Sequence, residues 1–202
     1  MKEETEKLFR ALKSEVIDLH LRWMIYRQLF AGSEADVEIL NRSGSNVFYL
    51  LQFWILDDVT LRLAKITDPP VQGKFENLSL ERLSASLEGD SRDFVERELR
   101  PVLDRLGGAC EKFRQLRNKR VAHRDLSHAI GLAEPPLPGI SREDVETALL
   151  LVREAMNKTE LHHSRSQTAY EQMIVPYDSD GNRLIKVLKL GLAAEEKERA
   201  TR

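Results

Sequence analysis

Cysteine is almost absent from this sequence of 202 residues, in which Cys110 is the only one. A single cysteine excludes an intramolecular disulfide framework. Long apolar runs are also missing. The longest, VFYLLQFWIL at residues 47–56, falls short of the roughly 18 residues that a membrane-spanning helix needs. The N-terminus, MKEETEKLFR, is too acidic and polar for a secretory signal peptide. We therefore expect a cytoplasmic protein with no membrane association.

The sequence also lacks a large excess of basic or of acidic residues. The 31 basic and 33 acidic residues give a net charge of −2, so the whole molecule is not a polycation drawn to nucleic acid. Any basic binding site must therefore be local. Metal ligands at regular spacing are also lacking. His162 and His163 are adjacent and point in different directions on a helix, and DSDG at 178–181 lacks the closing glutamate of a calcium loop. We expect surface histidines, a turn or helix cap at DSDG, and neither metal nor cofactor.

Apolar residues at steps of three and four predict long helices at the start of the chain. The first runs from Glu3 to about Leu29. The second runs from Glu34 to Ile66, with an interruption or kink near NRSGSN, and stops at TDPP because proline cannot continue it. Its later half is apolar over most of its circumference, which predicts a place in the centre of a helical bundle.

Shorter helices follow these two. Ser79 suits the N-cap of a helix in NLSLERL, and Ser141 suits the N-cap of a later helix that ends near LHHS. Between them, a helix that starts around Ser91 is bent or broken at Pro101 and continues to about Arg124. We therefore expect the segment between these two N-caps to be largely helical as well.

The C-terminal part of the chain allows two interpretations. The Asp180-Gly181 pair suits a hairpin turn, or a cap for a helix, and the helix formers beyond it favour the helix. The whole pattern predicts one all-α domain. It consists of an up-and-down helical bundle over residues 1–165 and a C-terminal helical extension over residues 166–202 that packs on or near the bundle.

The stretch FRQLRNKRVAHRD, residues 113–125, concentrates five basic residues with an asparagine and a histidine. On a helical wheel, Arg117, Arg120 and Arg124 extend a stripe of smaller and apolar residues rather than the opposite face; that stripe contains Leu106, Ala109, Cys110, Phe113 and Leu116. Two interpretations are open. The helix either emerges from the core here, where cations near its C-terminal end are favourable to the helix dipole, or it lines a cleft with inward-pointing guanidiniums.

Histidine, arginine and asparagine together suit the cleavage of RNA. RNA supplies its own nucleophile, the 2′-hydroxyl, so a metal-free ribonuclease needs a general acid or base and a fixed cation for the phosphate. His123 fits the first role and Arg117 the second, while Asn118 can position the phosphate or the imidazole.

The spacing of the motif raises a geometric difficulty. Residues six apart on a regular helix lie about 120° and 9 Å apart, so Arg117 and His123 do not share a face. Three solutions are open: the helix loosens between the two residues, the long arginine curls back, or two chains of a symmetric dimer contribute to one site.

The flanking residues add a resemblance to a known family. In LRNKRVAHRD the arginine is followed at once by asparagine, with the histidine a turn and a half later, and this resembles the HEPN superfamily. FWILDDVTLRLAKITDPP followed by ENLSLERL resembles its abortive-infection, AbiU-like branch. The resemblance covers residues 1–165. It implies a small helical bundle that dimerises with the two Arg-to-His segments facing each other across a cleft.

The same resemblance implies a function. Members are often metal-independent endoribonucleases of toxin-antitoxin or phage-defence systems, so RNA, a second copy of the chain and an antitoxin protein are the expected partners. Carried over by position, the catalytic residues are Arg117, Asn118 and His123. Contacts to the RNA backbone fall to the neighbouring cations Arg114, Lys119, Arg120 and Arg124.

Two alternatives stay open. The family often adds a polar residue from an earlier helix, for which Asp57 and Asp58 are the candidates here. Asp58 lies in line with Leu51, Trp54 and Leu61 on a face that we expect to point inward, where a carboxylate needs a partner. Besides an auxiliary catalytic role, the other interpretation of Asp58 is an ion pair with Arg62, one helical turn further on. The alternative function is a non-catalytic RNA-binding or protein-interaction module.

Overall fold

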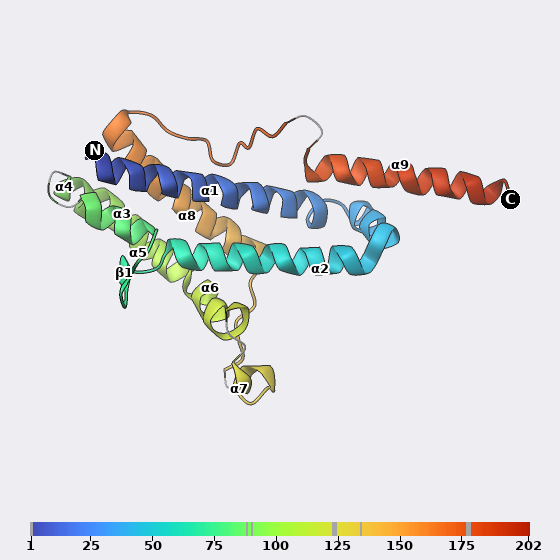
Figure 1. Cartoon of the computed structure of the whole chain (residues 1–202), viewed down its shortest axis with the longest axis horizontal. Coiled ribbons are helices and arrows are strands. Elements are labelled where there is room, and N and C mark those ends of the chain that lie inside the picture. The colour runs from blue at the N-terminus through green and yellow to red at the C-terminus, as the bar shows by residue number, and fades with distance from the viewer. Residues whose placement is uncertain (1, 88, 90, 123–124, 134, 177–178) are drawn as a thin grey trace. The chain divides into compact units, whose positions relative to one another are not determined.

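The computed structural model describes residues 2–87, 89, 91–122, 125–133, 135–176 and 179–202. Within these ranges the regular structure is helical apart from one short hairpin, which confirms the predicted all-α class (Figure 1). The chain divides into two compact units. Unit 1 comprises the chain from its start to Leu19 and from Thr60 to Tyr170, and unit 2 comprises His20–Val59 and Glu171–Arg202.

Two long helices run through both units. Helix α1 spans Glu3–Phe30 and helix α2 spans Glu34–Ile66. The backbone of α2 leaves helical geometry at Gly44, as the NRSGSN pattern predicts. The helix ends just before the TDPP sequence, because a proline nitrogen carries no hydrogen to donate and its ring clashes with the preceding turn. Both boundaries were therefore readable from local sequence.

The core of unit 1 is built from parts of α1 and α2 together with three further helices, α3 (Leu80–Leu87), α5 (Arg100–Ala109) and α8 (Arg142–Ser164). Helices α5 and α8 pack against each other. Their facing side chains are buried with those of α1 and α3; they include Leu12, Val16, Leu83, Val102, Leu106, Leu149 and Val152. Burial of these apolar faces is the main force that holds the unit together.

Two predicted N-caps are confirmed in unit 1. The backbone N–H of Arg82 donates to the Ser79 hydroxyl over 3.2 Å at the start of α3. Ser141 and Asp144 form a reciprocal capping box at the start of α8. Pro101 lies in the first turn of α5, where a missing N–H costs nothing. The irregularity expected near Pro101 is a π-helical turn, η1 (Val95–Leu99), which follows the short helix α4 (Arg92–Phe94).

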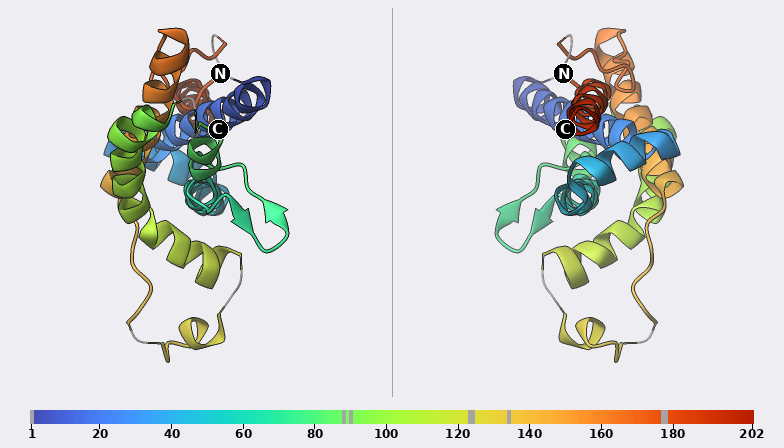
Figure 2. Two further views of the ribbon diagram at one scale, coloured as in Figure 1. Left: turned by 90° about the vertical axis from the view of Figure 1, so that its left-hand side faces the viewer. Right: turned by 90° about the vertical axis from the view of Figure 1, so that its right-hand side faces the viewer.

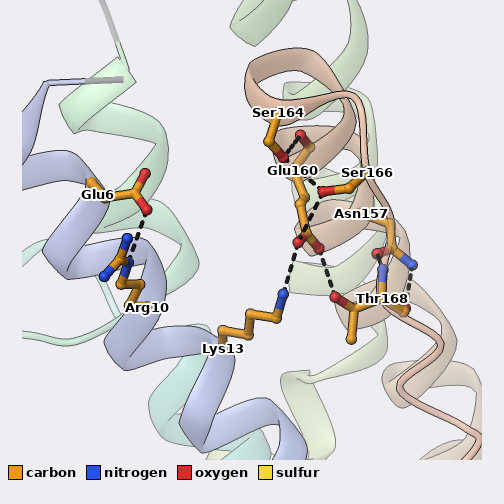
Figure 3. Close-up of polar contacts among 8 residues, drawn as sticks. All are labelled: Glu6, Arg10, Lys13, Asn157, Glu160, Ser164, Ser166 and Thr168. Atoms are coloured by element: carbon orange, nitrogen blue, oxygen red, sulfur yellow. Dashed lines mark hydrogen bonds and ion pairs between the residues drawn. The ribbon is translucent and has the colours of Figure 1, made fainter.

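A buried carboxylate ties the last turns of α8 to α1. Glu160 accepts a hydrogen bond from Nζ of Lys13 on α1 at 2.7 Å and another from the Thr168 hydroxyl at 2.8 Å (Figure 3). Asn157 holds the same return segment through both the N–H and the C=O of Thr168. The chain after α8 is therefore fixed along that helix.

The link between α2 and α3 carries a small antiparallel hairpin, which the sequence did not predict. Strand β1 (Val71–Gln72) pairs with β2 (Phe75–Glu76) around a turn in which Gly73 has a φ of 64°. Figure 2 shows the hairpin standing out from the ends of the neighbouring helices. A two-residue ladder is too short to give a clear alternating pattern in sequence.

Unit 2 contains the second half of α1, most of α2, and helix α9 (Gly181–Ala200). Leu29, Leu40 and Ile185 form its buried cluster. Asp180 caps α9 by accepting from the N–H of Arg183 at 2.9 Å, so the helix is confirmed over the hairpin alternative. Gln28 reinforces this cap, because its amide donates to Asp180 and accepts from the N–H of Gly181.

The predicted burial of the later half of α2 is wrong for its first three turns after the kink. Trp54 is 64% exposed, and several apolar neighbours share this exposure: Val47, Tyr49, Leu50 and Phe53. Of the expected inward stripe, Leu51 packs against the buried cluster of unit 2 and Asp58 is half-buried, so Trp54 is the member for which the prediction is wrong. The described part of unit 2 contains three helical segments, too few to surround α2 on every side.

Candidate active site

The basic stretch lies on two consecutive elements of unit 1, helix α6 (Glu111–Leu116) and the π-helical turn η2 (Arg117–Val121). Figures 1 and 2 show α6 and the short helix α7 (Leu126–Ala129) projecting beyond α5 and α8. The apolar stripe predicted for α6 is confirmed, since Phe113 and Leu116 are buried. Arg117 follows on the same side, and its side chain is only 15% exposed.

The helix widens at the motif itself. The N–H of Ala122 donates to the carbonyl of Arg117 at 2.8 Å, a step of five residues, and the N–H of Asp125 donates to the carbonyl of Lys119 at 3.0 Å. Such π-helical turns change the register of the residues that follow and occur often at functional sites. The loosened helix, one of the three solutions proposed for the spacing of the motif, is therefore present. His123 and Arg124 lie outside the described residues.

A carboxylate that the sequence did not single out holds Arg117. Nη1 of Arg117 lies 2.7 Å and 2.8 Å from the two carboxylate oxygens of Asp68. The Asp68 residue is only 8% exposed. It lies just beyond the end of α2, where its N–H donates to the carbonyl of Lys65. The pair thus fixes the guanidinium against the end of α2.

Asn118 also acts on Arg117 in this structure. Its side-chain oxygen accepts a hydrogen bond from Nε of Arg117 at 3.0 Å. Asn118 thus engages Nε of the planar guanidinium and Asp68 engages Nη1. Nη2 of Arg117 has no hydrogen bond to any of the described residues, and its two N–H groups can donate to the oxygens of a phosphate.

The other cations of the stretch differ in their surroundings. Arg114 is partly buried, and its guanidinium donates hydrogen bonds to the Thr67 hydroxyl, the carbonyl of Gly107 and the Glu111 carboxylate. Lys119 is exposed and lies 3.3 Å from a carboxylate oxygen of Asp125. Arg120 is also exposed, which agrees with the interpretation that the helix emerges from the core at this point. The stripe turns outward after Arg117 because the π-turn shifts the register.

The motif, the bundle that carries it and the Asp-Pro loop that holds its arginine form one connected arrangement, and the comparison with known families agrees with it. Residues 2–184 match the family model described as HEPN AbiU2. The chain belongs to the HEPN AbiU2 family. AbiU2 is an abortive-infection family of phage defence, so the resemblance read from residues 1–165 is confirmed and extends into α9. Neither the curated proteins nor the solved structures contain a significant match.

In this AbiU2 protein, the two auxiliary candidates lie on the part of α2 that belongs to unit 2. Asp57 and Asp58 are half-buried. Asp58 forms an ion pair of 2.7 Å with Nε of Arg22 on α1. Arg62, the partner expected for Asp58, contacts Glu15 at 2.8 Å and Asp18 at 3.1 Å. Asp57 and Asp58 therefore stay candidates on the strength of the family resemblance.

A second histidine near the motif was not singled out in the sequence. Nδ1 of His128 lies 2.8 Å from a carboxylate oxygen of Asp125, the N-cap of α7. Hydrogen bonds from the Ser127 hydroxyl and from His128 lower the pKa of Asp125, so this carboxylate stays ionised near neutral pH. The sequence signal for this pair is an aspartate three residues before a histidine, a spacing that one turn of helix brings together.

The remaining sequence predictions concern metals and membranes. Among the described residues no three histidine, cysteine or acidic side chains gather where they could hold a metal ion. His162 stacks on the Phe94 ring at 4.1 Å between centroids, and His163 is half-buried rather than on the surface as predicted. No helix within the described ranges is both long and apolar enough to cross a membrane.

Proposed function

We propose that this AbiU2 protein is a metal-independent endoribonuclease of a phage-defence or toxin-antitoxin system. The observation that carries the proposal is the fixed guanidinium of Arg117 in a widened helical turn. Asp68 engages its Nη1 and Asn118 its Nε, and Nη2, which has no hydrogen bond to the described residues, can donate to a phosphate oxygen. A cation held in place before the reaction stabilises developing charge without reorganising, which is the largest contribution in many enzymes.

The reaction follows from the chemistry of RNA. A base removes the proton of the 2′-hydroxyl, whose oxygen bonds to the adjacent phosphorus, while the bond from phosphorus to the 5′-oxygen breaks and that oxygen takes up a proton. The products are a 2′,3′-cyclic phosphate and a 5′-hydroxyl. We assign His123 to proton transfer, Arg117 to the charge on the phosphate, and Asn118 to positioning Arg117 or the phosphate.

Backbone contacts fall to the cations that follow Arg117. Lys119 and Arg120 are exposed on η2 and are suited to bind phosphates, and Arg124 is assigned the same role by its place in the sequence. Arg114 is also proposed to contribute positive charge near the RNA backbone. Its guanidinium donates hydrogen bonds to Thr67 and Gly107, so its position is fixed. Asp57 and Asp58 are proposed as auxiliary residues.

The test compares the wild-type protein with His123→Ala and Arg117→Lys on single-stranded and structured RNA in excess chelator. We expect cleavage by the wild type and a loss of at least about a hundredfold in His123→Ala, since general acid–base catalysis contributes about 10² to 10⁴. Arg117→Lys keeps the charge but loses the planar fork. The matched control is His162→Ala, a histidine on α8. Cleavage that persists in His123→Ala contradicts the assignment.

One observation favours the alternative, a non-catalytic RNA-binding or protein-interaction module. Asp68 neutralises Arg117, and a buried pair of this kind can serve the fold alone. This function predicts salt-sensitive RNA binding, no cyclic phosphate product, and full tolerance of His123→Ala. The two functions thus give opposite results in the same experiment.

A further inference from the structure

A cleft of about 360 Å³ in unit 1 is lined in part by Asp68, the carboxylate that holds Arg117. Its walls come from α1, the end of α2 and the loop before α3. Four apolar side chains line it, Leu12, Leu19, Ile66 and Leu78; the first three are buried and Leu78 is 41% exposed at the surface. The volume falls at the lower end of the range of about 300 to 1,000 Å³ for small-ligand sites, so it suits a group of nucleotide size.

Polar groups of the cleft suit a base and a phosphate. Nδ2 of Asn77 donates to the carbonyl of Pro69 at 2.8 Å, which fixes the amide, and its Oδ1 has no donor among the described residues. An amide oxygen held in this way can accept from the edge of a base. Lys65 on the wall is exposed and forms no ion pair with any described residue, so its charge is available to a phosphate.

The charges of the cleft are otherwise balanced. Arg62 on its wall is engaged by Glu15 and Asp18 of α1. Asp68, which also lines the cleft, is engaged by Arg117. The cleft combines four apolar side chains and ion-paired charges with one amide acceptor and one ammonium group that has no ion pair among the described residues. This combination fits a flat, uncharged ring with a single attached phosphate better than it fits a bare anion.

We infer that this cleft binds one unpaired nucleotide of the RNA substrate, next to the phosphate that is cut. The inference rests on the proposed function, and it adds the substrate class. Asp68 lines the cleft and also pairs with Arg117, so a strand whose scissile phosphate meets Arg117 carries a neighbouring base to the cleft. A base in a duplex cannot enter, because its faces are stacked and its edge is paired. The substrate is therefore single-stranded RNA, and the cleft selects the base that flanks the cut.

The test measures RNA affinity and cut-site preference separately. Affinities for a short single-stranded RNA are measured by fluorescence anisotropy in the His123→Ala background, where the RNA stays intact. Leu78→Trp fills the cleft from its edge and should weaken binding about tenfold. Lys65→Ala should reduce the slope of log affinity against log salt by about 0.7, the value for one phosphate of a single strand. Both variants should leave binding of a fully paired RNA unchanged.

Matched controls use the same residue types elsewhere. Leu161→Trp changes an exposed leucine on α8, and Lys186→Ala removes an exposed lysine of α9. Both should bind like the parent. In the cleaving background, Leu78→Trp should raise KM and flatten the base preference at the position flanking the cut. Free mononucleotide is added as a competitor to distinguish an RNA site from a site for a soluble nucleotide. A site for a soluble nucleotide would bind the mononucleotide tightly, and RNA affinity would then not depend on Leu78.

The outcomes separate this inference from the proposed function. If the wild type cleaves RNA and Leu78→Trp changes neither affinity nor base preference, the cleft assignment fails and the ribonuclease stands. If the wild type does not cleave, yet Leu78→Trp and Lys65→Ala both lose affinity for single strands, the ribonuclease fails and the cleft still binds RNA. Equal binding of single-stranded and paired RNA by all variants overturns the inference.

Discussion

Arg117 owes its orientation to two side chains, and their contributions differ in kind. Asp68 supplies a buried carboxylate, while Asn118 supplies a neutral oxygen from the adjacent residue. Because the Asp68 and Arg117 side chains are 11% and 15% exposed, removal of either charge leaves the other with little solvent to compensate it. Asp68 is thus a positioning residue for Arg117 as well as a link between α2 and η2.

Asp68→Asn tests this role at the scale of one residue. The substitution keeps the shape of the side chain and removes its charge, so we expect the free energy of unfolding to fall by about 3 kcal/mol, at the lower end of the effect of breaking a buried pair. We also expect RNA cleavage to fall with KM nearly unchanged, because the guanidinium loses its fixed orientation. Urea denaturation and steady-state kinetics measure the two effects. Asp104→Asn, an exposed aspartate on α5, should change neither quantity.

The π-helical turn η2 is the element on which the motif depends. A turn closed by a step of five residues holds one residue more than a regular helical turn. An extra residue in a turn changes the direction of the side chains that follow it in the chain. A regular helix through the same sequence would keep Arg117 and His123 about 120° apart.

Deletion of Lys119 tests the turn directly. We expect the shortened segment to close as a regular helix, with little change in helical content by circular dichroism, and cleavage to fall more than about a hundredfold because His123 is redirected. Lys119→Ala is the matched control, since it removes the side chain and keeps the residue count. It should weaken RNA binding severalfold and still cleave. Equal activity of the deletion and the substitution would show that the turn is irrelevant to catalysis.

The contact between α1 and α8 predicts a pH dependence of stability. Burial raises the pKa of Glu160, but hydrogen bonds from Lys13 and Thr168 outweigh it, so the pKa lies below its usual value. Because the pKa is lower in the folded state, Glu160 stabilises the protein at pH values above its unfolded-state pKa of about 4.3. This contribution is lost as the pH falls through the folded-state pKa.

Glu160→Gln should therefore lower the free energy of unfolding by about 2 kcal/mol at pH 7. The difference from wild type should narrow at pH 3.5 and below. Urea denaturation at the two pH values measures it. Glu4→Gln, an exposed glutamate near the start of α1, is the control and should show a small effect at both. A difference for Glu160→Gln that is independent of pH would contradict the account.

At the scale of the whole molecule, the proposed site can be completed within one chain or between two copies. The π-turn supports the first solution, and the family resemblance implies the second. A mixture of Arg117→Ala and His123→Ala proteins, exchanged at random, distinguishes them. After random exchange about half of the dimers are mixed. If each site takes Arg117 from one chain and His123 from its partner, a mixed dimer has one intact site out of two, so about a quarter of wild-type activity returns. No recovery after demonstrated exchange indicates a site within one chain.

Local chemistry made much of the fold predictable. Ser141, Asp180 and the proline pair after Asp68 mark helix ends within a few residues of themselves, and the structure confirms each. The buried stripe through Phe113 and Leu116 was readable for the same reason. A periodicity within one helix does not show how many neighbours cover it, which is why the exposure of Trp54 was missed.

The candidate site was predictable only where its residues are close in sequence. Arg117 and Asn118 could be selected from the motif, and they remain assigned by proposal. Asp68 lies 49 residues before its partner, and no local pattern joins the two. The π-turn has no signature in composition, because its hydrogen bonds involve backbone atoms alone. Long-range pairing and backbone register therefore required the structure.

The ends of the RNA fragments test the central claim most directly. Single-stranded RNA is incubated with wild type, His123→Ala and Asp68→Asn in excess chelator, and the termini are identified by mass spectrometry. We predict 2′,3′-cyclic phosphate and 5′-hydroxyl ends from the wild type, far fewer from Asp68→Asn, and none above background from His123→Ala. Intact RNA in every sample, or the same termini at the same rate from His123→Ala, would contradict the account.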